Sequence, residues 1–131
     1  MTEIQRELRA SPAAGRAARR ALDGWLTELV GETTADNVRL AASELVDNAV
    51  RHAGLSEEDV IVLSGVATED IVRIEVEQPT PVGDLRAVSP GDRQATEGGF
   101  GLHLVEALAT TWGFSDDGPG VVWFEVDRDV H

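Results

Sequence analysis

Apolar side chains recur at helical spacing in the first third of the chain. They fall on one face of a predicted helix: Ala14, Ala17, Ala18, Ala21, Leu22, Trp25 and Leu29. Arg16, Arg19 and Arg20 lie off that face. Ser11 followed by Pro12 is typical of a helix cap and first turn, and Gly31 of a helix end. The pattern therefore predicts an amphipathic helix between Ser11 and Gly31.

Two further stretches have the same period. The first begins at Thr33 or Thr34, where a hydroxyl side chain can cap a helix and Asp36 lies near its positive end, and it stops at Gly54. Its apolar positions are Val38, Ala41, Ala42, Leu45, Val46 and Ala49. The second has a broad apolar face made of Leu102, Leu104, Val105, Leu108, Ala109 and Trp112. We therefore expect three helices.

Shorter runs predict strands. Residues 60–66 and 71–77 are rich in β-branched residues, and the short link 67–70 between them suits a hairpin. Residues 3–8 alternate weakly and could form an edge strand, and residues 113–115 and 121–127 predict a closing hairpin around 116–119. Within residues 71–77, Val72, Ile74 and Val76 face one way and the charged residues between them the other, so one side of the sheet faces water. The order predicts one α+β domain over residues 1–131. It is a two-layer sandwich, with three helices on one face of a mixed, mostly antiparallel sheet.

The stretch 78–99 breaks this regularity, because it is rich in glycine and proline and has almost no apolar period. A loop of some 20 residues is unusual in a compact domain and is commonly functional. We expect a lid over about residues 78–98.

Composition and charge limit the classes of function that this chain can have. The chain has 11 basic and 24 acidic residues, a net charge of −13, which disfavours direct binding to nucleic acid. Solubility alone explains such a charge, and the alternative is an acidic face that meets a basic partner. The absence of cysteine excludes disulfides and thiolate chemistry. With no signal peptide and no membrane-spanning apolar run, we expect a cytoplasmic protein.

Three polar residues follow one another along the second predicted helix. At about 100° per residue, Glu44, Asn48 and His52 lie within roughly 80° of one another at the border of the apolar face. An Asn carbonyl oxygen suits Mg²⁺, and a Glu one turn away can orient or deprotonate a nucleophile. The alternative is three ordinary polar residues at a helix boundary.

A glycine cluster precedes the third helix. It comprises Gly98, Gly99, Phe100, Gly101 and Leu102, and exposed backbone N–H groups at a helix start favour anions. Glycine also serves simply to permit tight turns. The spacing matches neither the Walker nor the dinucleotide-binding motif.

Together, residues 44–52 resemble the N-box, and residues 99–105 the second glycine box, of the GHKL ATPase superfamily, which includes gyrase, Hsp90, MutL and histidine kinases. The small size, the Arg-bearing first helix and the segment 122–125 are similar to stand-alone actinobacterial relatives of anti-sigma-factor serine kinases. The resemblance implies a Bergerat-type fold that binds ATP with Mg²⁺. It implies that Glu44 is the general base, that Asn48 holds Mg²⁺, and that Gly98, Gly99 and Gly101 embrace the phosphates. It places Phe100, Leu102 and His52 among the nucleotide-binding residues.

The chain departs from the family at two positions. Gln78 occupies the position of an Asp that accepts the adenine amino group, and an amide presents donors as well as an acceptor. Near the C-terminus, Gly120 and Val121 stand where relatives carry Lys or Thr. Both changes affect the half of the pocket that recognises the base.

Two functions follow from the resemblance. One is a serine/threonine protein kinase that binds or phosphorylates a sigma factor or a STAS-type antagonist. The other is a non-catalytic module with a degenerate pocket that sequesters such a partner. Relatives are often homodimers, although no dimer seam is visible in this sequence.

Overall fold

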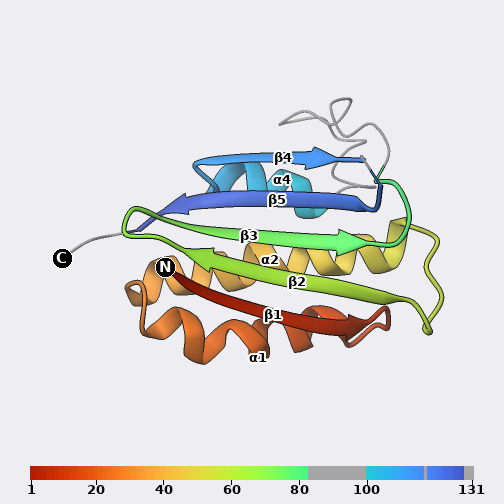
Figure 1. Ribbon diagram of the computed structural model, residues 1–131, viewed down its shortest axis with the longest axis horizontal. Coiled ribbons are helices and arrows are strands. Elements are labelled where there is room, and N and C mark those ends of the chain that lie inside the picture. The colour runs from red at the N-terminus through yellow and green to blue at the C-terminus, as the bar shows by residue number, and fades with distance from the viewer. Residues whose placement is uncertain (83–99, 117, 129–131) are drawn as a thin grey trace.

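Five antiparallel strands form a single sheet whose one face is covered by helices (Figure 1). The computed structural model describes residues 1–82, 100–116 and 118–128, without the side chains of Phe100 and His103. The strands are β1 (Thr2–Arg9), β2 (Val60–Ala67), β3 (Ile71–Gln78), β4 (Thr111–Ser115) and β5 (Gly120–Asp127), and the helices are α1 (Ala14–Thr27), α2 (Glu32–His52) and α4 (Phe100–Leu108). The sheet order is β1-β2-β3-β5-β4. The predicted α+β sandwich with helices on one face is confirmed.

Strict alternation along the strands separates the two faces of the sheet. On β3, Val72, Ile74, Val76 and Gln78 are buried, and the residues between them are only partly covered. The cross-strand pairs continue this division, since Ile74 lies opposite Gly65 on β2 and Phe124 on β5. The buried side chains of the sheet and those of the helices that pack on it form one core, and its largest fully buried members are Phe124, Leu22, Leu26, Ile61, Leu63, Ile74 and Leu102.

The helices begin at other residues than the sequence predicts. α1 begins at Ala14, because Ser11, Pro12 and Ala13 form a turn in which the Ala14 N–H donates to the Ser11 carbonyl at 3.0 Å. α2 begins at Glu32 with Gly31 as its N-cap, ahead of the expected Thr33 or Thr34. α1 ends at Thr27 with Glu28 as its C-cap, so Gly31 does not end the first helix as predicted but starts the second. The Ser11 hydroxyl accepts from the Ala13 N–H at 3.3 Å just before α1, whereas backbone geometry at Gly31 sets the start of α2.

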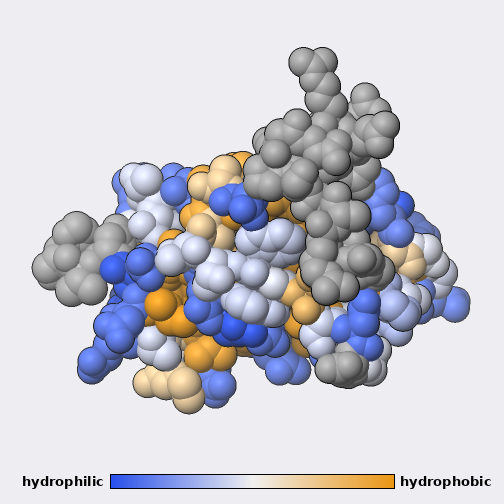
Figure 2. All heavy atoms as spheres, turned by 90° about the horizontal axis from the view of Figure 1, so that it is seen from above, coloured by the Kyte–Doolittle hydropathy of each residue, from blue (hydrophilic) through white to orange (hydrophobic). Residues whose placement is uncertain are grey.

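Trp112 lies in a different element from the helix that the sequence predicts. It continues the apolar period of the third helix, but that helix ends at Leu108 and Trp112 lies on β4 opposite Phe124. Its indole N–H donates to Glu106 on α4, so it joins the last helix to the edge strand. Seen from above, apolar side chains lie in patches among hydrophilic ones (Figure 2).

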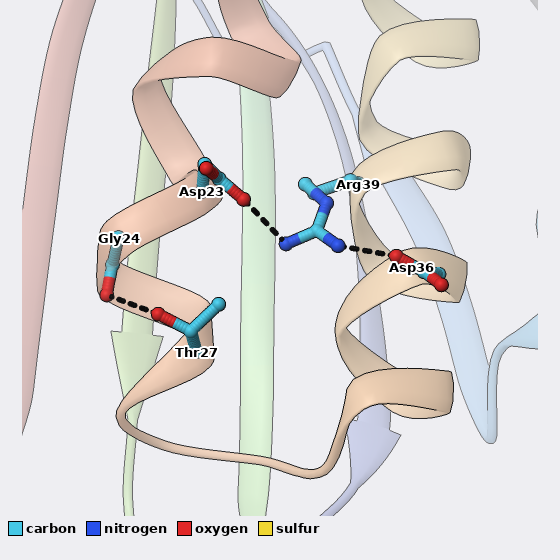
Figure 3. A network of polar contacts seen from close by, with 5 residues as sticks. All are labelled: Asp23, Gly24, Thr27, Asp36 and Arg39. Atoms are coloured by element: carbon cyan, nitrogen blue, oxygen red, sulfur yellow. Dashed lines mark hydrogen bonds and ion pairs between the residues drawn. The ribbon is translucent and has the colours of Figure 1, made fainter.

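The contact between α1 and α2 is close at one end and charged at the other. A Cβ on Gly15 would lie 2.2 Å from the Asp47 Oδ1 atom, so Gly15 lets the α2 carboxylate approach the first turn of α1. Farther along, Arg39 of α2 donates to Asp23 of α1 at 2.9 Å and to Asp36 on its own helix (Figure 3). The two contacts fix which side of α2 faces α1.

The face of the sheet away from the helices has a polar cluster near its centre. The Arg73 guanidinium lies 4.1 Å from the centroid of the Trp123 ring and donates to Glu75 and Glu125 at 2.8 Å each. Burial lowers the pKa of Arg73, but the hydrogen bonds and charges of the two carboxylates outweigh it and raise that pKa. Trp123 in turn lies across Gly113, where a Cβ would be 2.7 Å from the indole.

Candidate functional site

Glu44 and Asn48 lie on the side of α2 that faces away from α1. Asn48 comes nine positions after Arg39, which at about 100° per residue puts it roughly 180° around the helix. Since Arg39 bonds to α1, Asn48 is directed toward α4, which packs against α2 on its other side. Glu44, one turn earlier, shares this flank. Both residues are partly buried, whereas His52, at the end of the helix, is exposed.

The Asn48 side chain has an unsatisfied oxygen within the part of the chain that the structure describes. Its Oδ1 atom is buried and has no hydrogen-bond partner within the described residues. Leaving a buried acceptor unpaired costs about 1–3 kcal/mol, so such an atom is unusual in a well-formed helix. A carbonyl oxygen in this state fits the hard, oxygen-seeking Mg²⁺ ion, which takes few protein ligands. Asn48 is therefore a suitable magnesium ligand.

Gln78 ends β3 as one of two buried polar side chains among the described residues, with 5% of its surface exposed. Its amide nitrogen donates to the Thr80 carbonyl at 3.0 Å, to the Pro81 carbonyl at 3.2 Å and to the Thr80 hydroxyl at 3.3 Å. These acceptors fix the orientation of the amide and engage its donors. The carbonyl oxygen is the polar group that remains, so Gln78 can act as an acceptor, as an Asp does.

Residues 79–82 are held on three sides. The Thr80 hydroxyl donates to the Ala53 carbonyl at the end of α2 at 3.1 Å, and the Val82 N–H donates to the Asp116 carboxylate at 2.8 Å. On the third side a Cβ on Gly120 would lie 2.5 Å from the Thr80 carbonyl oxygen, so β5 must begin with a residue that has no side chain. Gly120 thus has a packing role that sequence reasoning missed. The roles of Thr80 and Asp116 depend on contacts distant in sequence.

The glycine cluster is only partly described. Gly98 and Gly99 lie outside the described residues, as does most of the predicted lid. Phe100 and Gly101 form the start of α4, whose first N–H groups have no partner within the helix. The Leu102 side chain is 2% exposed and belongs to the core, so only its backbone is suited to contact a phosphate.

The described residues contain neither a ready-made metal site nor a membrane-spanning helix. No group of three or more His, Asp or Glu side chains there is arranged to hold a metal ion by itself. No described helix has the length and apolar character needed to span a membrane. A magnesium ion at Asn48 would therefore depend on ligands from elsewhere, such as water or phosphate oxygens.

Comparison with known structures supports the fold. The chain superimposes over its whole length on the RsbU and RsbW domains of Rv1364c from Mycobacterium tuberculosis, with a TM-score of 0.72 and 22% identity, and covers 34% of that chain. It thus spans about a third of the length of that solved chain. It also matches the histidine kinase AdeS of Acinetobacter baumannii, with a TM-score of 0.52 and 15% identity, covering 99% of this chain and 70% of that one. No curated protein matches significantly.

Comparison of this sequence with family models is more specific than the comparison with solved structures. The family model described as the histidine kinase-like ATPase domain matches residues 8–124, which include α2, the end of β3 and the start of α4. The match therefore contains the flank with Glu44 and Asn48, the acceptor at Gln78 and the glycine cluster. The chain belongs to the histidine kinase-like ATPase domain family.

Proposed function

We propose that this protein binds ATP with Mg²⁺ between α2, the end of β3 and the start of α4, and transfers phosphate to a protein partner. The observation that carries the proposal is the buried, unpaired Oδ1 atom of Asn48 on the flank it shares with Glu44. The cost of an unpaired buried oxygen is removed when a cation binds it. Family membership makes ATP the expected nucleotide.

Gln78 supports adenine as the base. Because its amide nitrogen is engaged by the Thr80 and Pro81 acceptors, its side chain has an oxygen left to offer a ligand. That oxygen can accept from the exocyclic amino group of adenine, whereas the carbonyl at the same position of guanine would repel it. We expect ATP to bind more tightly than GTP.

In the proposed reaction each residue has one role. Bound Mg²⁺ would neutralise charge on the phosphates, and Asn48 would hold it through Oδ1. Glu44 would accept the proton of a serine or threonine hydroxyl of the partner, which then attacks the terminal phosphorus as ADP leaves. Backbone N–H groups of Gly98, Gly99, Phe100, Gly101 and Leu102 would bind phosphate oxygens, and His52, exposed at the end of α2, would border them.

Calorimetry tests the binding step. The native chain should bind ATP with Mg²⁺ and bind it more weakly in the presence of EDTA. Asn48→Leu, which removes the unpaired oxygen at similar volume, should fold normally and lose most of the magnesium dependence. Gln78→Leu should weaken ATP binding by about ten- to a hundredfold. The proposal is wrong if the native chain gives no heat with any nucleotide at high concentration.

The catalytic step needs a separate experiment. Glu44→Gln keeps the size and the hydrogen bonds of the side chain but removes its basicity. It should bind ATP as the native chain does and lose phosphate transfer to a partner serine. Retained transfer would remove Glu44 from the role of general base.

A second candidate is a non-catalytic module that binds a sigma factor or a STAS-type antagonist. It is favoured by the same Gln78 amide, because the side chain braces its own loop and the charge of the family Asp is absent. Binding of a partner without nucleotide, and without any effect of Asn48→Leu, would favour this function over the kinase.

A further inference from the structure

The peptide group that joins Pro81 to Val82 is held by one contact at each end. Its N–H donates to the Asp116 carboxylate at 2.8 Å, and its carbonyl accepts from the amide nitrogen of Gln78 at 3.2 Å. Because a peptide group is planar and trans, its N–H and its carbonyl point in opposite directions and turn together. A partner that fixes the N–H therefore also fixes the carbonyl that Gln78 uses.

Sheet pairing places Asp116 beside this peptide group, although Asp116 and Val82 are distant in sequence. β4 pairs with β5 as far as Ser115, and Gln78 at the end of β3 lies opposite Gly120 (Figure 1). The ends of β3 and β4 therefore flank the start of β5. That start leaves room for the contact, since a Cβ on Gly120 would lie 2.9 Å from the Val82 nitrogen. A carboxylate one residue after β4 thus reaches the segment that follows β3.

The contacts of the Gln78 amide decide which of its atoms faces a ligand. Its nitrogen is directed at the Thr80 and Pro81 carbonyls, at 3.0 and 3.2 Å. An amide turned over would instead place its oxygen against those two carbonyl oxygens, which repel it. If the Pro81 carbonyl turns away, one source of this repulsion is lost, and the nitrogen can face the ligand more often. The orientation of Gln78 therefore depends on what holds the Pro81–Val82 peptide group.

We propose that Asp116 is a positioning residue for nucleobase selection, acting through the Pro81–Val82 peptide group and the Gln78 amide. An oxygen at Gln78 accepts from the 6-amino group of adenine, whereas a nitrogen in its place would donate to the 6-oxo group of hypoxanthine or guanine. By keeping the oxygen toward the base, Asp116 favours a 6-amino purine. This role rests on the proposed function, because it supposes that a nucleotide binds with its base at Gln78. It adds the end of β4 to the elements that decide which base is accepted.

Calorimetry with ATP and ITP tests the selection, since ITP carries a 6-oxo group where ATP carries a 6-amino group. With Mg²⁺ in excess, the native chain should bind ATP about tenfold or more tightly than ITP. Asp116 is exposed and is not part of the core, so Asp116→Ala should fold. This variant should reduce the ratio of the two affinities to about threefold or less. Asp116→Asn, which keeps an acceptor oxygen, should restore most of the ratio.

Asp59→Ala is the matched control. The Asp59 carboxylate also accepts from a backbone N–H at 2.8 Å, that of Ser56, and its removal makes the same change in net charge. It should leave the ratio of ATP to ITP affinity unchanged. In the background of Gln78→Leu, Asp116→Ala should no longer alter the ratio, because its effect passes through the Gln78 amide.

Nuclear magnetic resonance of the chain without nucleotide gives a second readout. The side-chain amide protons of Gln78 should exchange slowly with solvent, because Thr80 and Pro81 accept from them and the side chain is buried. Asp116→Ala should shift these signals and speed their exchange, whereas Asp59→Ala should do neither.

Three outcomes would overturn the proposed role of Asp116. The first is an unchanged ratio of ATP to ITP affinity in Asp116→Ala. The second is an equal change of that ratio in Asp59→Ala, which would assign the effect to net charge. The third is unchanged Gln78 amide signals in Asp116→Ala. Each is compatible with ATP binding by the native chain and leaves the proposed function standing. Failure of the native chain to bind either nucleotide would instead overturn the proposed function, and base selection with it.

Discussion

The contact between Gly15 and Asp47 makes a quantitative prediction about stability. Replacing glycine by alanine within a helix ordinarily stabilises a protein by about 0.5–1 kcal/mol, because glycine loses more backbone entropy on folding. At Gly15 the new Cβ would lie 2.2 Å from Asp47 Oδ1 and 2.6 Å from Asp47 Cγ, far inside contact distance. The carboxylate must therefore move away from the first turn of α1, where negative charge is favourable and no side chain caps the helix.

The expected net effect of Gly15→Ala is a loss of about 1–2 kcal/mol. Overpacking costs about 1–3 kcal/mol, and the displaced carboxylate adds a few tenths or more, which together exceed the helix-propensity gain. At a urea slope of about 1.5 kcal/mol/M, the midpoint of unfolding should fall by roughly 1 M. Gly24→Ala is the matched control on the same helix, since a Cβ there meets nothing within 4 Å. It should raise the stability by about 0.5–1 kcal/mol.

A double-mutant cycle isolates the contact. In the background of Asp47→Ala, the Gly15→Ala substitution should become neutral or stabilising, with a coupling energy of about 1.5–3 kcal/mol. If Gly15→Ala stabilises the native chain as much as Gly24→Ala does, the reasoning from steric approach is wrong.

Three other substitutions test contacts elsewhere in the fold. Arg128→Ala removes the donors that join the α1–α2 loop to the β2–β3 hairpin and should cost about 2–3 kcal/mol in urea unfolding, whereas Arg128→Lys should recover less than half. Arg73→Gln leaves two carboxylates together on the open sheet face and should lower the melting temperature at low salt more than at high salt. Because the pKa of the Arg73 guanidinium is raised, the stability that Arg73 adds to the fold should be constant around neutral pH. It should be lost only when strongly alkaline pH passes through the raised pKa. Gly65→Ala would bring a Cβ within 2.9 Å of Trp25 and should destabilise by about 1–3 kcal/mol, and an unchanged urea midpoint would contradict that contact.

The net charge of the chain bears on the proposed nucleotide binding. A net charge of −13 repels a free nucleotide, so ATP binding depends on local donors and on a cation at Asn48. Magnesium in excess and moderate salt should therefore strengthen ATP binding.

The amino-acid sequence by itself determined the order of the elements, the helix faces and the alternation of β3. These are local patterns of side-chain polarity whose period decides which face can be buried. The N-box resemblance likewise needed only the residue types over 44–52, which lie on one helix. The family match extends this resemblance over residues 8–124.

Only the tertiary structure decided what depends on contacts between distant parts of the chain. Trp112 keeps the helical period yet lies on β4, because pairing with β5 outweighs a short continuation of α4. The interpretation of Gln78 also depends on contacts that only the tertiary structure shows. The sequence indicated an amide with both donors and an acceptor, but the Thr80 and Pro81 carbonyls engage the donors and leave the acceptor. The unpaired oxygen of Asn48 is likewise a property of its surroundings, since packing around the helix determines which polar atoms find partners.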